Sequence, residues 1–192
     1  FFVAGFETTS TTIAFLLYFL ATNEDAQAKI REEIFKVVGE EVFTQETLSK
    51  LTYLEQCIFE TMRLCPPIAR IDRQAKKDIK IGELLLPKDI IFSVPVYTLH
   101  MLPEVWPEPD KWNPDRFSPE EKAARDPMYY LPFGAGPRQC IGMRLALLEI
   151  KMAIADLLRK FRFLPTDETP IPLKLKRDAI LSISQKPMIL KV

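Results

Sequence analysis

The stretch LPFGAGPRQCIGMR, residues 131–144, carries the most specific signal in the sequence. It holds three of the chain's six glycines, and these bracket Cys140 at the start of a strongly helical segment. Glycine adopts backbone conformations that other residues avoid and lets the chain approach a ligand closely. A thiol at a helix N-terminus faces unpaired amide groups and the positive end of the helix dipole. Both favour the thiolate, which is the form that binds a metal.

The residues of this loop alone leave two other interpretations open. The loop could be a glycine turn before a helix with a buried, inert cysteine. Cys140 could also be a nucleophile paired with His100, the chain's single histidine, although nothing in the sequence places the two together. A phosphate-binding loop is excluded because no Gly-Lys-Ser/Thr follows, and the third glycine is misplaced for a dinucleotide fingerprint.

Composition bounds the function classes. The chain has 192 residues, of which 47% are hydrophobic and 27% charged, as in ordinary globular proteins. Lys and Arg number 26 and Asp and Glu also 26, so the basic excess of a nucleic-acid binder is missing. Three cysteines do not make a disulfide framework and indicate a reducing compartment. One histidine excludes a metal site built from several histidines.

Proline divides the chain into helical and non-helical blocks. Residues 1–65 and 138–164 contain none of the 16 prolines, and residues 66–137 contain 12. Because proline breaks helix interiors, the sequence predicts helices at about 1–22, 24–38, 52–64 and 141–162, with a short helix opening at Thr44. In the last long helix, one face is expected to hold Ile141, Leu145, Leu148, Met152 and Ala155, thickened by Leu147, Ile150, Ile154 and Leu158.

The proline-rich middle, residues 66–137, is predicted to hold strands, turns and irregular chain. Strand candidates lie at 79–81, 84–86 and 90–94, the first two joined as a hairpin around Gly82. Residues 103–137 form an ordered meander, in which Trp106, Trp112 and Phe117 are expected to be buried. The tail, residues 171–192, alternates like strands.

The chain begins with Phe1 and has no basic leader. Its longest apolar run, residues 13–21, is shorter than the roughly 20 residues of a membrane span. The first element has no helix cap before it, so the chain is interpreted as a fragment that starts inside a helix.

At this point the sequence resembles the cytochrome P450 family. The loop matches the family's haem signature, F-x-x-G-x-R-x-C-x-G, at Phe133, Gly136, Arg138, Cys140 and Gly142. Three more motifs follow the family's order: the oxygen-activation helix at residues 4–9, E-x-x-R at residues 60–63, and P-E-R-F at residues 114–117, with Asp115 in place of Glu. Residues 66–77 and 130–151 are most similar to the microsomal enzymes of vertebrate family 3 and insect family 6.

The resemblance implies a mainly α fold with small β elements, of which residues 1–192 would be the C-terminal, haem-binding part of one domain. Cys140 would be the axial thiolate on the iron of haem b, and Arg138 would pair with a haem propionate. Arg73 matches a second propionate-binding position, with a solvated surface charge as the alternative. Phe133 and Gly136 would shape the haem-binding loop.

The resemblance also assigns roles away from the loop. Glu7 and Thr8 would deliver protons for oxygen activation, with a polar stripe on an amphipathic helix as the alternative. Glu60 and Arg63 would form a buried network with Arg116 that holds the meander against its helix, with a surface ion pair as the alternative. Ala4, Ile68 and Ala69 would line the substrate pocket.

The activity implied is monooxygenation of an apolar small molecule, with electrons from NADPH through NADPH-cytochrome P450 reductase and with cytochrome b5 as a further donor. The alternatives are a P450-type isomerase or dehydratase, which often lacks the helix threonine, and a non-catalytic haem-thiolate sensor. Mitochondrial members tend to carry paired arginines just after the signature, and Arg144 stands alone here. This favours the cytoplasmic face of the endoplasmic reticulum membrane, reached through an N-terminal anchor that this chain lacks. The fragment alone is expected to be inactive.

Overall fold

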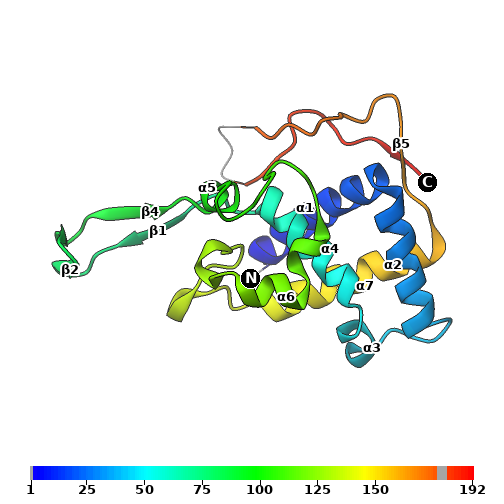
Figure 1. Cartoon of the computed structure of the whole chain (residues 1–192), viewed down its shortest axis with the longest axis horizontal. Coiled ribbons are helices and arrows are strands. Elements are labelled where there is room, and N and C mark those ends of the chain that lie inside the picture. Colours follow the sequence, from blue (N-terminus) through cyan, green and yellow to red (C-terminus); the bar gives the residue numbers. More distant parts are fainter. Residues whose placement is uncertain (1, 177–180) are drawn as a thin grey trace.

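The computed structural model describes residues 2–176 and 181–192. Its body is a group of helices, α1 (Phe2–Thr22), α2 (Glu24–Val37), the short α3 (Gln45–Ser49), α4 (Thr52–Leu64) and α7 (Met143–Lys160) (Figure 1). The strands are few and short. The expectation of a mainly α fold with small β elements is therefore confirmed.

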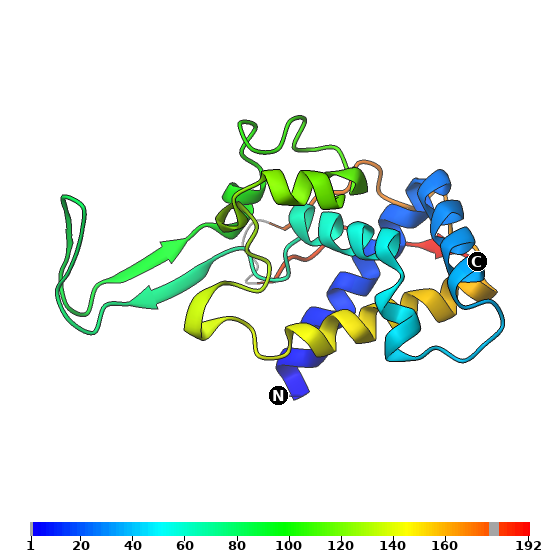
Figure 2. The same ribbon diagram turned by 60° about the horizontal axis from the view of Figure 1, so that its bottom comes forward.

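Four of the strands form a ribbon that projects from the helical body (Figures 1 and 2). β1 (Ile71–Gln74) pairs antiparallel with β4 (Ile91–Val94), and β2 (Ile79–Ile81) pairs antiparallel with β3 (Leu84–Leu86). Gly82 turns the β2–β3 hairpin with φ +57°, a conformation that favours glycine. The hairpin predicted around Gly82 is confirmed, whereas β1, with its polar sequence IDRQ, was not predicted.

The core lies where the C-terminal half of α1 meets α2, α4 and α7. Helix α4 contributes its periodic apolar face, because Leu54, Ile58 and Met62 are each no more than 1% exposed. Leu16 and Leu20 of α1 are fully buried against it. This packing fixes α4, and with it the charged motif at residues 60–63.

Helix α4 receives its N-terminal cap from α2. Its own N-cap residue, Leu51, makes no side-chain cap. Instead the carboxylate of Glu33 accepts from the backbone amides of Tyr53 (2.8 Å) and Leu54 (3.0 Å) and from the hydroxyl of Thr52 (3.2 Å). A carboxylate at this end also complements the helix dipole.

Helix α7 differs from its prediction in bounds and in orientation. It begins at Met143, after Ile141 and Gly142, and ends at Lys160. Ile141, Leu145 and Met152 are 88%, 59% and 43% exposed, so this part of the predicted face is not buried, whereas Ala155 and the residues predicted to thicken the face, Ile150, Ile154 and Leu158, are buried. The buried residues are Ile150, Lys151, Ile154, Ala155 and Leu158. The reason is that α1, α2, α3 and α4 pack on this second side of the helix.

The proline-rich middle contains more helix than expected. The structure places α5 at Val96–His100, α6 at Pro119–Ala124, and 3₁₀ turns at Pro114–Phe117, Pro127–Tyr129 and Gly136–Arg138. Proline disrupts helix interiors but suits the first helical turn, where its missing N–H has no partner to lose. Several of these elements begin with proline in that position. Trp106 and Phe117 are buried as expected, and Trp112 is half-buried.

Within residues 171–176 and 181–192, the tail forms fewer strands than its alternation suggests. The pair β5 (Leu164–Pro165) and β6 (Leu190–Lys191) is accompanied by isolated bridges Ile68–Leu181 and Leu175–Ser184. Residues 177–180, which fall within the predicted strands, lie outside the described residues, as does Phe1.

By length and composition alone, α1 could cross a membrane, although the apolar run at residues 13–21 suggested a shorter segment. Core helices of soluble proteins pass the same test. The C-terminal half of α1 is buried, with Phe15, Leu16 and Leu20 no more than 1% exposed, whereas its N-terminal half is largely exposed.

Candidate functional site

The cysteine loop is a tightly turned segment that enters α7. Gly134 and Gly136 have φ of +71° and +75°, so both occupy the left-handed region that other residues rarely adopt. The Gly134 amide donates to the Leu131 carbonyl (3.1 Å), and the Cys140 amide donates to the Phe133 carbonyl (2.9 Å). These two hydrogen bonds close the loop and hold Cys140 just before the helix.

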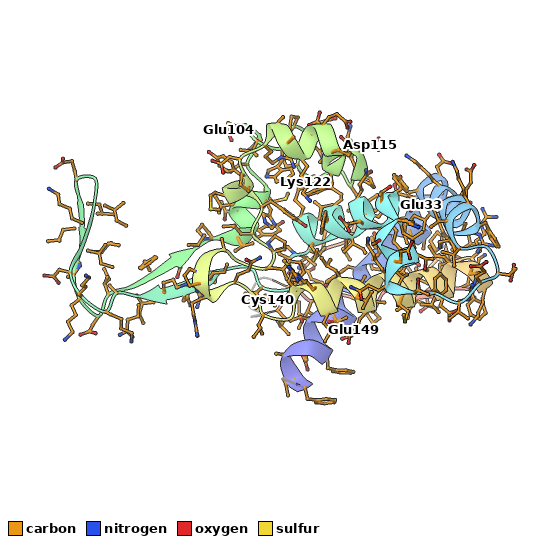
Figure 3. All side chains as sticks on the ribbon, turned by 90° about the horizontal axis from the view of Figure 1, so that it is seen from below. Glu33, Glu104, Asp115, Lys122, Cys140 and Glu149 are labelled. Atoms are coloured by element: carbon orange, nitrogen blue, oxygen red, sulfur yellow. The ribbon has the colours of Figure 1, made fainter. Side chains whose placement is uncertain are left out.

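The thiol of Cys140 is available to a ligand. Cys140 is exposed, whereas Cys57 and Cys65 are buried, and burial raises the pKa of both of these thiols. Figure 3 shows Cys140 on the loop that precedes α7. Gly142, the N-cap of α7, makes no side-chain cap, so it leaves the amides of the first turn without a side-chain acceptor of its own. The interpretation of Cys140 as a buried, inert cysteine is therefore wrong.

The surroundings of Cys140 fit haem. Among residues 2–176 and 181–192, no group of three or more His, Cys, Asp or Glu side chains could hold a metal. Haem iron takes a single cysteine thiolate from the protein, and the exposed thiol of Cys140 can serve as one. A Cβ at Gly142 would lie 4.0 Å from the Cys140 sulfur, so glycine keeps the space beside the thiol open.

The N-terminal half of α1 carries Ala4, Glu7 and Thr8. Ala4 and Glu7 are exposed, and Thr8 is half-buried. The Thr8 hydroxyl donates to the Ala4 carbonyl (2.7 Å), the bond to the carbonyl four residues back that can locally bend a helix. This end of α1 also exposes the stacked rings of Phe2 and Phe6, and it crosses α7, whose first turn follows the cysteine loop (Figure 2).

Glu60 and Arg63 form an ion pair with no exposed side-chain surface. Arg63 Nε and Nη2 each donate to one carboxylate oxygen over 2.8 Å, and the Asn113 amide donates to the same carboxylate over 2.9 Å. Arg63 also donates to the backbone carbonyls of His100 (2.9 Å) and Lys111 (3.1 Å). The surface ion pair considered from the sequence is therefore wrong, and the pair connects α4 to the meander.

The other arginines lie at different distances from this pair. Arg116 Nε lies 3.5 Å from Glu60 Oε1 without a hydrogen bond. Among the described residues, it is the one buried side-chain nitrogen or oxygen that has no hydrogen-bond partner. Arg138 is exposed at the 3₁₀ turn Gly136–Arg138. Arg73 lies on β1 opposite Phe92, and its Nη1 donates to the carbonyl of Asp72 (2.9 Å). Of these three arginines, only Arg116 lies within ion-pair distance of Glu60.

His100 is fully buried, and both of its ring nitrogens have hydrogen-bond partners. The backbone amide of Leu131 donates to its Nε2 (3.0 Å), and its Nδ1 lies 3.2 Å from the carbonyl of Arg63. Burial lowers the pKa of His100 from 6.5 to about 4. The nitrogens of a neutral imidazole occupied in this way are not free to activate a nucleophile, so the pairing of His100 with Cys140 is not supported. No sequence pattern signalled these contacts, because their partners are 31 and 37 residues away.

Of the two predicted pocket residues after α4, Ala69 borders a cavity. Ala69 lines a cavity of about 1080 Å³ between α1, the end of α4, the meander and the tail. Ile68 is 44% exposed and bridges to Leu181 of the tail. Ala4 lies apart from these two, on the exposed end of α1.

Comparison with known proteins decides the family. The sequence model of the cytochrome P450 family matches residues 1–192. The chain belongs to the cytochrome P450 family. Among curated P450s, it is 47% identical to cytochrome P450 3A2 and 46% identical to cytochrome P450 3A1, both of Rattus norvegicus, and 45% identical to cytochrome P450 3A14 of Cavia porcellus.

These P450 matches cover 100% of this chain but 38% of each relative's length. The similarity to family 3 expected from residues 66–77 and 130–151 is confirmed. The loop, the buried Glu60–Arg63 pair and the end of α1 are thus features of a P450 chain that represents little more than a third of such relatives.

Proposed function

We propose that these 192 residues are the C-terminal haem-binding part of a monooxygenase that oxidises apolar small molecules. The observation that carries the proposal is the exposed thiol of Cys140 on a loop turned by Gly134 and Gly136. When bound, haem b supplies an iron that activates O2, so that one oxygen atom enters the substrate and the other leaves as water.

The chain's own residues hold and orient this group. Cys140 would provide its thiolate to the haem iron, and the amides at the start of α7, which have no side-chain cap, would stabilise its negative charge. Phe133 fixes the loop through its carbonyl, and Arg138 offers its guanidinium fork to one propionate. Arg73, at the base of the ribbon, offers a charge to the second.

The end of α1 serves the other side of the site. The hydroxyl of Thr8 can exchange its bond to Ala4 for one to a water, and the exposed carboxylate of Glu7 can pass a proton to it. Ala4, without a large side chain, leaves room beside them. Ile68 and Ala69 border the substrate.

Electron supply and location follow the same proposal. The electrons come from NADPH through cytochrome P450 reductase, with cytochrome b5 as a further donor, at the cytoplasmic face of the endoplasmic reticulum membrane. The neutral net charge of the chain supports no nucleic-acid partner. An isomerase or dehydratase would form its product without consuming NADPH, and a sensor would form none.

The test uses the haem-loaded protein that contains this chain. Its reduced CO complex should show the red-shifted Soret band of thiolate ligation. Cys140→Ser should abolish this band, and the matched variants Cys57→Ser and Cys65→Ser should keep it, because both thiols are buried away from the loop. A thiolate band that survives in Cys140→Ser would exclude Cys140 as the ligand. NADPH consumption coupled to product separates the monooxygenase from the two alternatives.

A further inference from the structure

His100 contacts two parts of the site, the buried Glu60–Arg63 pair and the cysteine loop. On one side it meets the buried pair, because Arg63 Nη1 donates to the His100 carbonyl (2.9 Å) while the His100 ring faces the Arg63 carbonyl. On the other side its Nε2 receives the amide of Leu131, the first residue of the cysteine loop. One imidazole thus touches both the charge network and the loop.

The contacts of this ring determine its tautomer. A backbone amide can only donate, so Nε2 must be the unprotonated acceptor of the Leu131 amide. The proton of the neutral ring therefore sits on Nδ1 and is donated to the Arg63 carbonyl. The ring is stacked against Tyr130 with a centroid separation of 5.1 Å and an interplanar angle of 27°, which prevents it from turning freely.

From Leu131, backbone hydrogen bonds continue to the cysteine. The Leu131 carbonyl accepts a hydrogen bond from the amide of Gly134. The carbonyl of Phe133, the residue just before Gly134, accepts one from the amide of Cys140. A shift of Leu131 would move both acceptors. The position of the thiol is thereby connected to the ring of His100 through two successive turns of the loop.

We propose that His100 is a positioning residue that sets the cysteine loop against the Glu60–Arg63 pair through an acceptor at Nε2. The inference rests on the proposed haem-thiolate site. This role requires the side chain at position 100 to accept a hydrogen bond from the Leu131 amide. A side chain that only fills the core would not be enough. His100 touches neither the metal nor the substrate in this proposal and acts through Leu131 and Cys140.

Two amide side chains separate these requirements. In His100→Gln, the amide oxygen reaches the position of Nε2 and can accept from Leu131. In His100→Asn, the shorter amide reaches the position of Nδ1 and can serve Arg63, but it leaves the Leu131 amide without its acceptor. Both variants replace an imidazole with a neutral polar group, so they share the loss of aromatic packing against Tyr130.

The experiment follows the reduced CO complex of the haem-loaded protein over time. We expect His100→Asn to lose the thiolate band roughly tenfold faster than wild type, as for a buried amide deprived of its acceptor, and His100→Gln to restore most of the difference. Tyr18→Phe removes a part-buried tyrosine bond to the Pro170 carbonyl (2.8 Å), at residues that contact neither His100 nor Leu131, and should leave the rate unchanged. Equal rates in the Asn and Gln variants would overturn the inference.

Hydrogen exchange in the wild-type protein gives a second test that needs no variant. The Leu131 amide should be protected as strongly as the amides of α4, and exchange at the rate of an exposed loop would also overturn the inference. If the wild type itself lacks the thiolate band, the proposed function fails first. If the wild type has the band and the two variants behave alike, the role of His100 alone is wrong.

Discussion

Arg63 holds both carboxylate oxygens of Glu60, through Nε and Nη2 at 2.8 Å each, and neither side chain has exposed surface. A buried pair of this kind is costly to form from water but far costlier to break on one side, because the remaining charge stays buried. The pair also receives the Asn113 amide and reaches the carbonyls of His100 and Lys111. It therefore holds the meander and α5 to α4.

Removing one partner of this pair should unfold the site. We expect Glu60→Ala to lower the free energy of unfolding by about 3–5 kcal/mol, because Arg63 is left buried without its carboxylate. Urea unfolding and the haem content of the purified protein measure this. The control is Glu46→Ala, which breaks an exposed pair with Lys50 and should leave the unfolding midpoint unchanged. Normal haem loading and stability in Glu60→Ala would contradict the structural role.

The loop's left-handed glycine should matter for haem as well as for stability. Gly136 has φ +75° and no atom within 4 Å of an added Cβ, so Gly136→Ala introduces backbone strain of about 1 kcal/mol without a clash. Gly82→Ala provides a matched control, because φ is +57° and the space around it is equally open. Both variants should lose similar stability, but only Gly136→Ala should bind haem more weakly in a titration. Equal haem affinity in the two variants would show that the conformation of Gly136 does not affect haem binding.

The hydroxyl of Thr8 should affect chemistry but not ligation. We expect Thr8→Ala to lower product formed per NADPH consumed by about tenfold or more, because a positioned proton donor contributes at least that much. Thr8→Ser, which keeps the hydroxyl, should retain most of the coupling. Ser10→Ala removes a hydroxyl on the same helix that bonds only the Glu7 carbonyl and should change nothing. If Thr8→Ala forms as much product per NADPH as the wild type, Thr8 does not take part in proton delivery.

The pH dependence of stability should carry the signature of His100. Its pKa is lowered by burial from 6.5 to about 4, so the unfolded chain binds a proton between these values that the folded chain does not. Stability is then complete above about pH 6.5 and falls by roughly 3 kcal/mol as the pH drops toward 4. His100→Gln cannot titrate, so its unfolding free energy should decline less steeply over this range. Parallel curves for wild type and variant would show that His100 is not buried as a neutral ring.

Expressed by itself, this chain should bind haem weakly and should not turn over. The apolar side chains around the site are largely uncovered. Their exposed fractions are 59–88%, for Ile141 and Leu145 near the cysteine loop and for Phe2 and Phe6 at the end of α1. Such surface also promotes aggregation. Size-exclusion chromatography and haem titration measure both effects. A soluble monomer with stoichiometric haem and activity would show that the 192 residues are self-sufficient.

Local patterns predicted the parts of the molecule that depend on neighbours in the chain. The bounds of α4 and the turn at Gly82 are such cases, and the spacing around Cys140 was specific enough to indicate the family. The elements that were missed depend on distant partners. β1 is polar and exists through its pairing with β4, and the orientation of α7 is set by the helices that cover it.

The site shows the same division. Glu60 and Arg63 are three residues apart, so the sequence could place them on one face, but their burial results from the meander folding over them. The contacts of His100 span more than 30 residues and left no local trace. The helical turns at Pro114, Pro119 and Pro127 were missed because proline was interpreted only as a helix breaker.

The cap that Glu33 places on α4 has a consequence for the order of assembly. With 13 residues, α4 is near the length at which an isolated helix is marginal in water. Its first amides find their acceptor on α2, about 20 residues earlier. We therefore expect α4 to become persistent only as it docks on α2. The pairing of Glu60 with Arg63 would then be a late event on the folding pathway, and a slow step between α2 and α4 would delay every contact that the meander makes.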